Sequence, residues 1–218
     1  MKHNQSTEDY IKGIYKLQQD GGTVSTSELA AHLEITDASV TDMVKKLSER
    51  KLLWHTPYRG VELTEQGKRL ALKMMRRHRL WEMLLVKFLG YSWDEVHDEA
   101  ELLEHVTSDE MEQRLDKALG YPKVDPHGDP IPTAEGILEV KELRKLSDSS
   151  TGDRVAIARV NDDDSALLQH ASRLGLELNA KLRVEEKLDF DGSMTVKVGN
   201  KKKFISKKLA EAVFVTKA

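Results

Sequence analysis

Two short helical patterns, joined by a tight turn and followed directly by a hairpin pattern, constrain this fold more than any other feature. The patterns predict helices over residues 24–33 and 37–50, separated by Glu34-Ile35-Thr36. Two short β-like runs then flank a turn at residues 56–60, with Arg59 at its tip. This order is typical of a winged helix-turn-helix, in which the second helix enters the major groove of double-stranded DNA. A generic helical domain with a hairpin is the alternative.

The expected recognition helix begins with small and hydroxylated residues and ends with basic ones. Small residues allow a close approach to base edges, whereas basic residues reach phosphates. We expect DNA contacts near the bases from Thr36, Ala38, Ser39 and Asp42. We expect contacts to the DNA backbone from Ser25, Thr26, Thr41, Lys45, Lys46, Arg50 and Arg59.

Charge is strongly segregated along the chain, although the net charge is only -3. Residues 1–80 hold 14 Lys+Arg against 10 Asp+Glu, whereas residues 81–140 hold 4 against 15. A basic first third suits a polyanion, and an acidic middle attracts cations. The chain has no cysteine, which excludes disulfides and thiolate ligands, so any metal must bind through oxygen and nitrogen.

The acidic middle carries a helical face of potential metal ligands. Helices are expected over residues 65–89 and 94–119, and His97, Glu101, Glu104 and His105 fall at i, i+4, i+7 and i+8 of the second. A solvated acidic face is the simpler interpretation. Two other sets of residues favour a metal site: the pair His78 and Glu82, and the proline-rich loop 125–132 with its His and two Asp. The same helical segment also carries an apolar face suited to packing against another subunit, formed by Leu102, Leu103, Val106, Met111 and Leu115.

The C-terminal part changes to short strands. Strands are expected over 154–160, 181–187, 193–198, 202–206 and 212–215, with a helix over 165–174, which suits a small SH3-like barrel. We therefore expect a mainly α protein with a small β domain. Its parts would be a DNA-binding domain (1–72), a helical dimerisation and metal-binding domain (73–140), a linker (141–152) and the barrel (153–218).

Three motifs together carry a family resemblance. They are Arg77-His78-Arg79-Leu80 with Glu82, the stretch from Val96 to His105, and Pro126-His127-Gly128-Asp129-Pro130-Ile131-Pro132. They resemble the diphtheria-toxin-repressor family, whose third domain is of the ferrous-transport-accessory type. The resemblance implies a homodimer that binds divalent metal and then a palindromic operator. It implies a primary metal site at Asp9, Glu101, Glu104 and His105, and a second site drawing on His78, Glu82, His97, Asp125, His127 and Asp162, the last chosen from Asp162-Asp163-Asp164.

The identity of the metal turns on two positions. Iron-responsive members of the family place methionine at the position of Asp9 and cysteine at that of Glu101, whereas manganese-responsive members place carboxylates at both. The sequence therefore resembles the manganese type, and hard oxygen ligands with one imidazole suit Mn²⁺. Lys12 stands where some manganese regulators have a glutamate, and we expect it to repel a second cation or to pair with Glu104. Fe²⁺ stays open as the alternative.

The resemblance implies a repressor of metal-homeostasis genes with Mn²⁺ as co-repressor, and not an enzyme. With no signal-like segment and no long apolar run, we expect a cytoplasmic protein without a membrane partner. Two rival interpretations stay open. One is a mononuclear metallohydrolase using the same His and Glu cluster, and the other is a metal-independent regulator in which that cluster is an ion-pair network.

Overall fold

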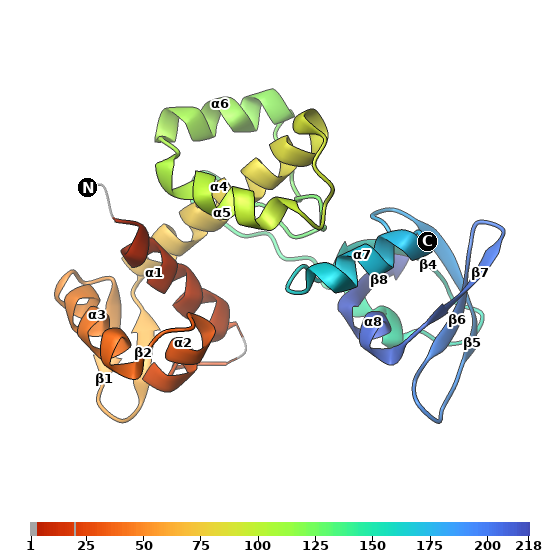
Figure 1. Cartoon of the computed structure of the whole chain (residues 1–218), viewed down its shortest axis with the longest axis horizontal. Coiled ribbons are helices and arrows are strands. Elements are labelled where there is room, and N and C mark those ends of the chain that lie inside the picture. The colour runs from red at the N-terminus through yellow and green to blue at the C-terminus, as the bar shows by residue number, and fades with distance from the viewer. Residues whose placement is uncertain (1–3, 20) are drawn as a thin grey trace. The chain divides into compact units, whose positions relative to one another are not determined.

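The computed structural model describes residues 4–19 and 21–218 and divides into two compact units. The first comprises Met1–His78, Glu101–Arg114 and Pro132–Leu138, and the second comprises Arg79–Ala100, Leu115–Ile131 and Glu139–Ala218. Figure 1 labels the α-helices and most of the strands. No helix within the described residues is both long and apolar enough to span a membrane.

The first unit begins with a winged helix-turn-helix. It contains α1 (Gln5–Gln18), α2 (Thr26–His32), α3 (Asp37–Glu49), the hairpin β1 (Leu53–Thr56) and β2 (Gly60–Leu63), and the start of α4 (Glu65–Leu89). The two strands pair antiparallel with Leu53 opposite Leu63, and Val61 also bridges to Val24 in front of α2. The bridge fastens the hairpin to the helices through backbone hydrogen bonds in both directions between Val24 and Val61.

Local capping explains where these helices begin. Ser25 and Glu28 form a reciprocal capping box at α2, and the Thr36 side chain accepts from the backbone N–H of Ser39 at α3. Helix α1 begins at Gln5, where the Asn4 side chain accepts from the N–H of Thr7.

The single helix expected over residues 94–119 is two helices. They are α5 (Val96–Val106) and α6 (Asp109–Leu119), separated at Thr107-Ser108. Thr107 Oγ1 donates to the Leu103 carbonyl, and Ser108 Oγ accepts from the Met111 N–H, which starts α6. A β-branched residue followed by a capping serine and an acidic first turn therefore outweighs the continuous apolar pattern.

Buried ion pairs attach α6 to α4 within the first unit. Glu112 accepts from Arg76 Nε at 3.0 Å and from Arg77 Nε at 2.9 Å, and all three side chains are buried. Arg76 also donates to the Pro132 carbonyl. Satisfied in this way, the charges can remain inside without a solvent shell.

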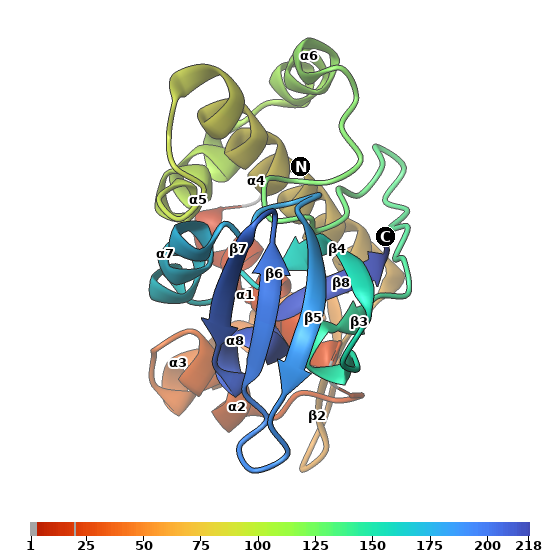
Figure 2. The same ribbon diagram turned by 90° about the vertical axis from the view of Figure 1, so that its right-hand side faces the viewer.

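The second unit contains a six-stranded antiparallel sheet. Its strands are β3 (Arg144–Lys145), β4 (Arg154–Val160), β5 (Lys181–Lys187), β6 (Met194–Val198), β7 (Lys201–Ile205) and β8 (Val213–Lys217), in the order β3-β8-β4-β5-β6-β7. Figure 2 shows β5, β6 and β7 side by side. Three helical elements accompany the sheet: η1 (Leu146–Asp148), α7 (Ser165–Leu174) and α8 (Lys207–Ala212).

Two local expectations in this unit are corrected. Residues 144–148, expected in a linker, form β3 and η1, and Leu146 is fully buried in the sheet's core. Helix α8, which the sequence pattern did not predict, precedes β8. The Ser206 side chain caps it by accepting from the Leu209 N–H. The Ser, Asp and Gly residues at the end of the expected linker belong instead to the turns that lead into β4.

The proline-rich loop docks on β4. The Val160 N–H donates to the His127 carbonyl, and Arg159 pairs with Asp129 at 3.2 Å. Gly128 has a φ of +96° and approaches so closely that a Cβ there would lie 2.1 Å from the Ala158 carbonyl oxygen. Glycine is thus required at this contact, which fixes His127 beside the end of β4.

Candidate metal centres

The first cluster of metal-ligand atoms joins α1 to α5. Asp9, Glu101 and His105 each place one ligand atom within 4.8 Å of the others. Asp9 Oδ1 and His105 Nε2 are 2.9 Å apart, and both are buried without a hydrogen-bond partner among the described residues. Adjacent ligands on one ion, with bonds of about 2.1 Å, lie about 3 Å apart. The pair thus has the spacing of two ligands of a shared cation.

The expected fourth ligand, Glu104, is fully buried on the same helix. Its Oε1 lies 3.6 Å from His105 Nε2. Burial raises the pKa of Asp9, and the nearby Glu101 and Glu104 raise it further, although His105 and Lys12 oppose the change. Such a carboxylate favours a cation that would restore its charged form.

Glu8, which the sequence analysis did not select, orients the histidine. Its Oε2 lies 2.7 Å from His105 Nδ1, and its side chain is buried. A carboxylate accepts the Nδ1–H, which leaves the Nε2 lone pair directed toward Asp9 and Glu104. The only sequence signal was a second acid adjacent to Asp9 on α1.

Lys12 enters the same cluster from the next turn of α1. Its Nζ lies 2.5 Å from Glu101 Oε2 and 2.7 Å from Glu104 Oε1, the pairing with Glu104 that the sequence suggested as one alternative. Burial alone would lower the pKa of Lys12, but Glu104 and Glu101 outweigh it and raise the pKa. Lys12 is therefore a charged partner of both carboxylates.

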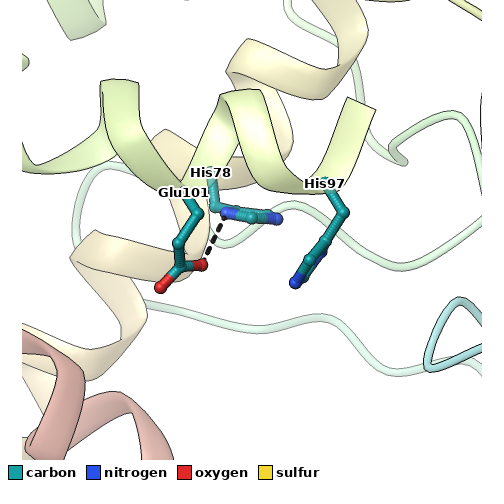
Figure 3. Close-up of side chains that lie close together, drawn as sticks. All are labelled: His78, His97 and Glu101. Carbon is teal, nitrogen blue, oxygen red and sulfur yellow. Dashed lines mark ion pairs between the residues drawn. The ribbon is translucent and has the colours of Figure 1, made fainter. Parts of the chain in front are cut away.

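His78, expected in the second site with Glu82 and His97, contacts the first cluster and also offers a ligand atom within 4.8 Å of those of His97 and Glu101. Its Nδ1 lies 2.7 Å from Glu104 Oε2 and 3.6 Å from Glu101 Oε2. Figure 3 shows the ion pair between His78 and Glu101, with His97 one turn before Glu101 on α5. Both oxygens of Glu104 are thus engaged, one by His78 and one by Lys12.

The second cluster lies between α4, the docked loop and the end of β4. Glu82, His127 and Asp162 each offer one atom within 4.8 Å of the others. His127 Nδ1 lies 3.9 Å from Glu82 Oε2 and 3.9 Å from Asp162 Oδ2. His127 Nε2 lies 2.7 Å from the Trp93 carbonyl, which can only accept, so the proton sits on Nε2. Nδ1 then presents a lone pair to carboxylates, an arrangement that fits a shared cation.

The remaining second-site residues flank this group. His97 Nδ1 lies 3.8 Å from Glu82 Oε1, and the His97 side chain is 58% exposed. Asp125 Oδ1 accepts from the N–H groups of His127 and Asp129, and its Oδ2 faces Arg79 Nε at 3.3 Å. Burial, with added repulsion from nearby acids, raises the pKa of Asp125 to about 7 despite Arg79.

The expected DNA-contacting residues are exposed or half-buried on the winged helix. Several of their hydroxyls already serve the helices, since Ser25 and Thr36 act as caps and Thr41 donates to the Asp37 carbonyl. Arg50 Nη1 donates to Thr7 Oγ1 on α1 at 3.0 Å. The exposed members are Thr36, Ala38, Ser39, Asp42, Lys45, Lys46, Arg50 and Arg59. Tyr58 in the hairpin turn is also fully exposed and was not selected from the sequence.

A winged helix with clusters of carboxylates and imidazoles at two places defines a metal-dependent DNA-binding regulator. Three family models match in succession: the iron dependent repressor N-terminal DNA binding domain (3–61), the iron dependent repressor metal binding and dimerisation domain (64–133) and the FeoA domain (144–217). The chain belongs to the diphtheria-toxin-repressor family of metal-dependent transcriptional repressors.

Relatives cover nearly the whole chain. The iron-dependent repressor IdeR of Mycobacterium tuberculosis is 33% identical, with 97% of each chain covered. A manganese-dependent transcriptional repressor in complex with manganese is 38% identical with a TM-score of 0.87, covering 97% of this chain and all of the other. The manganese regulator SloR is 34% identical with a TM-score of 0.75, covering both chains completely.

These findings confirm the resemblance inferred from the motifs and the mainly α fold with a small β domain. The FeoA match agrees with the expected accessory-type third domain. The relatives are repressors and not enzymes, which overturns the metallohydrolase alternative. They include both iron- and manganese-dependent proteins, so family membership leaves the choice of metal open.

Proposed function

We propose that Mn²⁺ is the co-repressor of this chain and binds at Asp9, Glu101, Glu104 and His105. The observation that carries the proposal is the buried pair of Asp9 Oδ1 and His105 Nε2, 2.9 Å apart with neither atom hydrogen-bonded among the described residues. Carboxylate oxygens with one imidazole and no sulfur favour a hard divalent ion.

Fe²⁺ is the second candidate, and the similarity to IdeR favours it. The donor set argues against Fe²⁺ as the preferred ion, because a thioether or thiolate is what would raise the affinity for Fe²⁺ over Mn²⁺ at such a site. A thiolate is excluded because the chain has no cysteine, and positions 9 and 101 both carry carboxylates.

We propose a second ion site at Glu82, His127 and Asp162, with Asp125 and His97 beside it. His127 supports this assignment, because its Nε2–H is fixed on the Trp93 carbonyl while its Nδ1 faces carboxylate oxygens at 3.9–4.0 Å. A cation there would offset the charge of Glu82 and Asp162 and fasten α4 to the end of β4. His78 contacts Glu104 of the first site and also lies close to His97.

The protein would act as a homodimer on a palindromic operator controlling metal-homeostasis genes. Support for dimerisation comes from Leu102, Val106 and Met111, which leave an exposed apolar surface on α5 and α6. The exposed face of α3 would enter the major groove, with Lys45, Lys46 and Arg59 on phosphates.

The test uses protein stripped of metal and DNA selected from a random-sequence pool by the metal-loaded protein. We expect Mn²⁺ to restore DNA binding at lower free concentration than Fe²⁺ under anaerobic conditions, and Asp9→Asn to abolish the response while leaving the fold intact. DNA binding that is equally tight with and without metal would contradict the co-repressor role. A lower threshold for Fe²⁺ would assign iron instead.

A further inference from the structure

Lys12 occupies the centre of the first cluster. It lies three residues after Asp9, so both side chains leave the same face of α1. The ammonium contacts one oxygen of Glu101 and one of Glu104, and the Lys12 side chain is only 22% exposed. Glu104 Oε1, which receives Lys12, is also the oxygen 3.6 Å from His105 Nε2.

A divalent ion and the ammonium would therefore compete for the same oxygens. Both oxygens of Glu104 already have a partner, Oε2 in His78 and Oε1 in Lys12. An ion held by Asp9 and His105 that recruits Glu104 Oε1 would lie beside the Lys12 ammonium, which is 2.7 Å from that oxygen, and repulsion between the two cations favours withdrawal of a partner. His78 is a buried side chain on α4, whereas Lys12 has a long flexible stem with an exposed portion, so Lys12 is the partner able to leave.

We propose that the Lys12 ammonium is a built-in counter-ion that holds the Glu101–Glu104 position until a divalent ion displaces it. The inference rests on the proposed first metal site. In the metal-free state, Lys12 then fastens α1 to α5 through Glu101 and Glu104. This arrangement also makes Lys12 the residue that sets the metal concentration for the response, since binding must first break two ion pairs.

Affinity is tested by titrating metal-free protein with Mn²⁺ and following the electron paramagnetic resonance signal of the free ion. All proteins carry Glu82→Gln, which disables the proposed second site. We expect Lys12→Leu to lower the dissociation constant at least about tenfold, because it removes both a competitor and a like charge. Lys12→Arg, which keeps the charge, should stay near the Glu82→Gln parent. Lys16→Leu is the matched control, an exposed lysine one turn later on α1.

A second measurement tests, in the protein without a substitution at position 12, whether metal displaces Lys12 from Glu101 and Glu104. Lysine acetylation is quantified by mass spectrometry with and without Mn²⁺, using the reactivity of Lys16 as the internal reference. Lys12 should become several-fold more reactive when metal binds, since its ammonium leaves two carboxylates for solvent. Unchanged or reduced reactivity overturns the inference, and so does a Lys12→Leu protein that binds Mn²⁺ no more tightly than the parent.

The two proposals fail differently. If Asp9→Asn binds Mn²⁺ as tightly as the parent, the first site itself is wrongly assigned, and the inference on Lys12 falls with it. If Asp9→Asn weakens binding while Lys12→Leu leaves it unchanged, only the inference on Lys12 is overturned.

Discussion

Replacing Glu8 by glutamine tests whether the first cluster is built as a metal site or only as an ion-pair network. The substitution keeps the size of the side chain and an acceptor for His105 Nδ1, but it removes the negative charge. The hydrogen bond between His105 Nδ1 and Glu8 Oε2 is short, at 2.7 Å, and largely shielded from water. Hydrogen bonds to charged groups contribute about 1.5–3 kcal/mol, and loss of a partner behind a metal-binding histidine costs about 10- to 100-fold in affinity.

Glu8→Gln should therefore weaken Mn²⁺ binding by about 10- to 100-fold, or about 1.4–2.8 kcal/mol. The assay is calorimetric or spectroscopic titration of the Glu82→Gln protein with and without Glu8→Gln. Glu65→Gln is the matched control, because Glu65 is an exposed glutamate that pairs with the exposed Lys68. Equal affinity of Glu8→Gln and its parent would refute the orienting role of Glu8.

Three further predictions concern selectivity, pH and DNA. Asp9→Met combined with Glu101→Cys should shift the metal response from Mn²⁺ toward Fe²⁺, measured as the ratio of the two dissociation constants, and an unchanged ratio would contradict the donor argument. In metal-free protein, the raised pKa of Asp125 makes its carboxylate destabilise the fold progressively as pH rises from 3.8, its ordinary pKa, to about 7. The unfolding free energies of wild type and Asp125→Asn should therefore run parallel below pH 3.8, diverge between pH 3.8 and about 7, and run parallel again above that range. A pH-independent difference would exclude a raised pKa for Asp125. Lys46→Gln should weaken DNA binding and reduce the slope of log affinity against log salt by about one, and an unaltered slope would remove Lys46 from the phosphate contacts.

The elements predicted most accurately are those with strong local signals. The helix expected over 65–89 and the strand expected over 154–160 have these bounds in the structure. Both are long for their type, with clear periodicity and turn residues at their ends. The break at Thr107-Ser108 was missed because the apolar pattern continues across it, and only the side-chain hydrogen bonds of those two residues show where one helix ends.

The sequence indicates which residues are potential metal ligands, but it does not indicate which of them lie together. His78 and Glu82 share a face of α4 by their i, i+4 spacing, which predicted a chelating pair. Spacing fixes only the face, whereas the partners come from distant parts of the chain: Glu104 binds His78, and His127 approaches Glu82 from the docked loop. Gly128 positions that loop against β4, and the hydrophobic periodicity of the sequence does not predict this contact.

Lys12 shows most clearly how sequence and structure differ in what they predict about regulation. Counting charges, Asp9, Glu101 and Glu104 predict a metal-free cluster that repels itself. With Lys12 and His78 on the same carboxylates, the metal-free cluster is instead held together by ion pairs and a hydrogen bond. Metal then acts by exchanging one cation for another of higher charge. The free energy available for the response is the difference between the interaction free energies of the metal ion and of the Lys12 ammonium with the same carboxylates. The metal concentration needed for the response can therefore be changed by substitution at position 12 without altering a metal ligand.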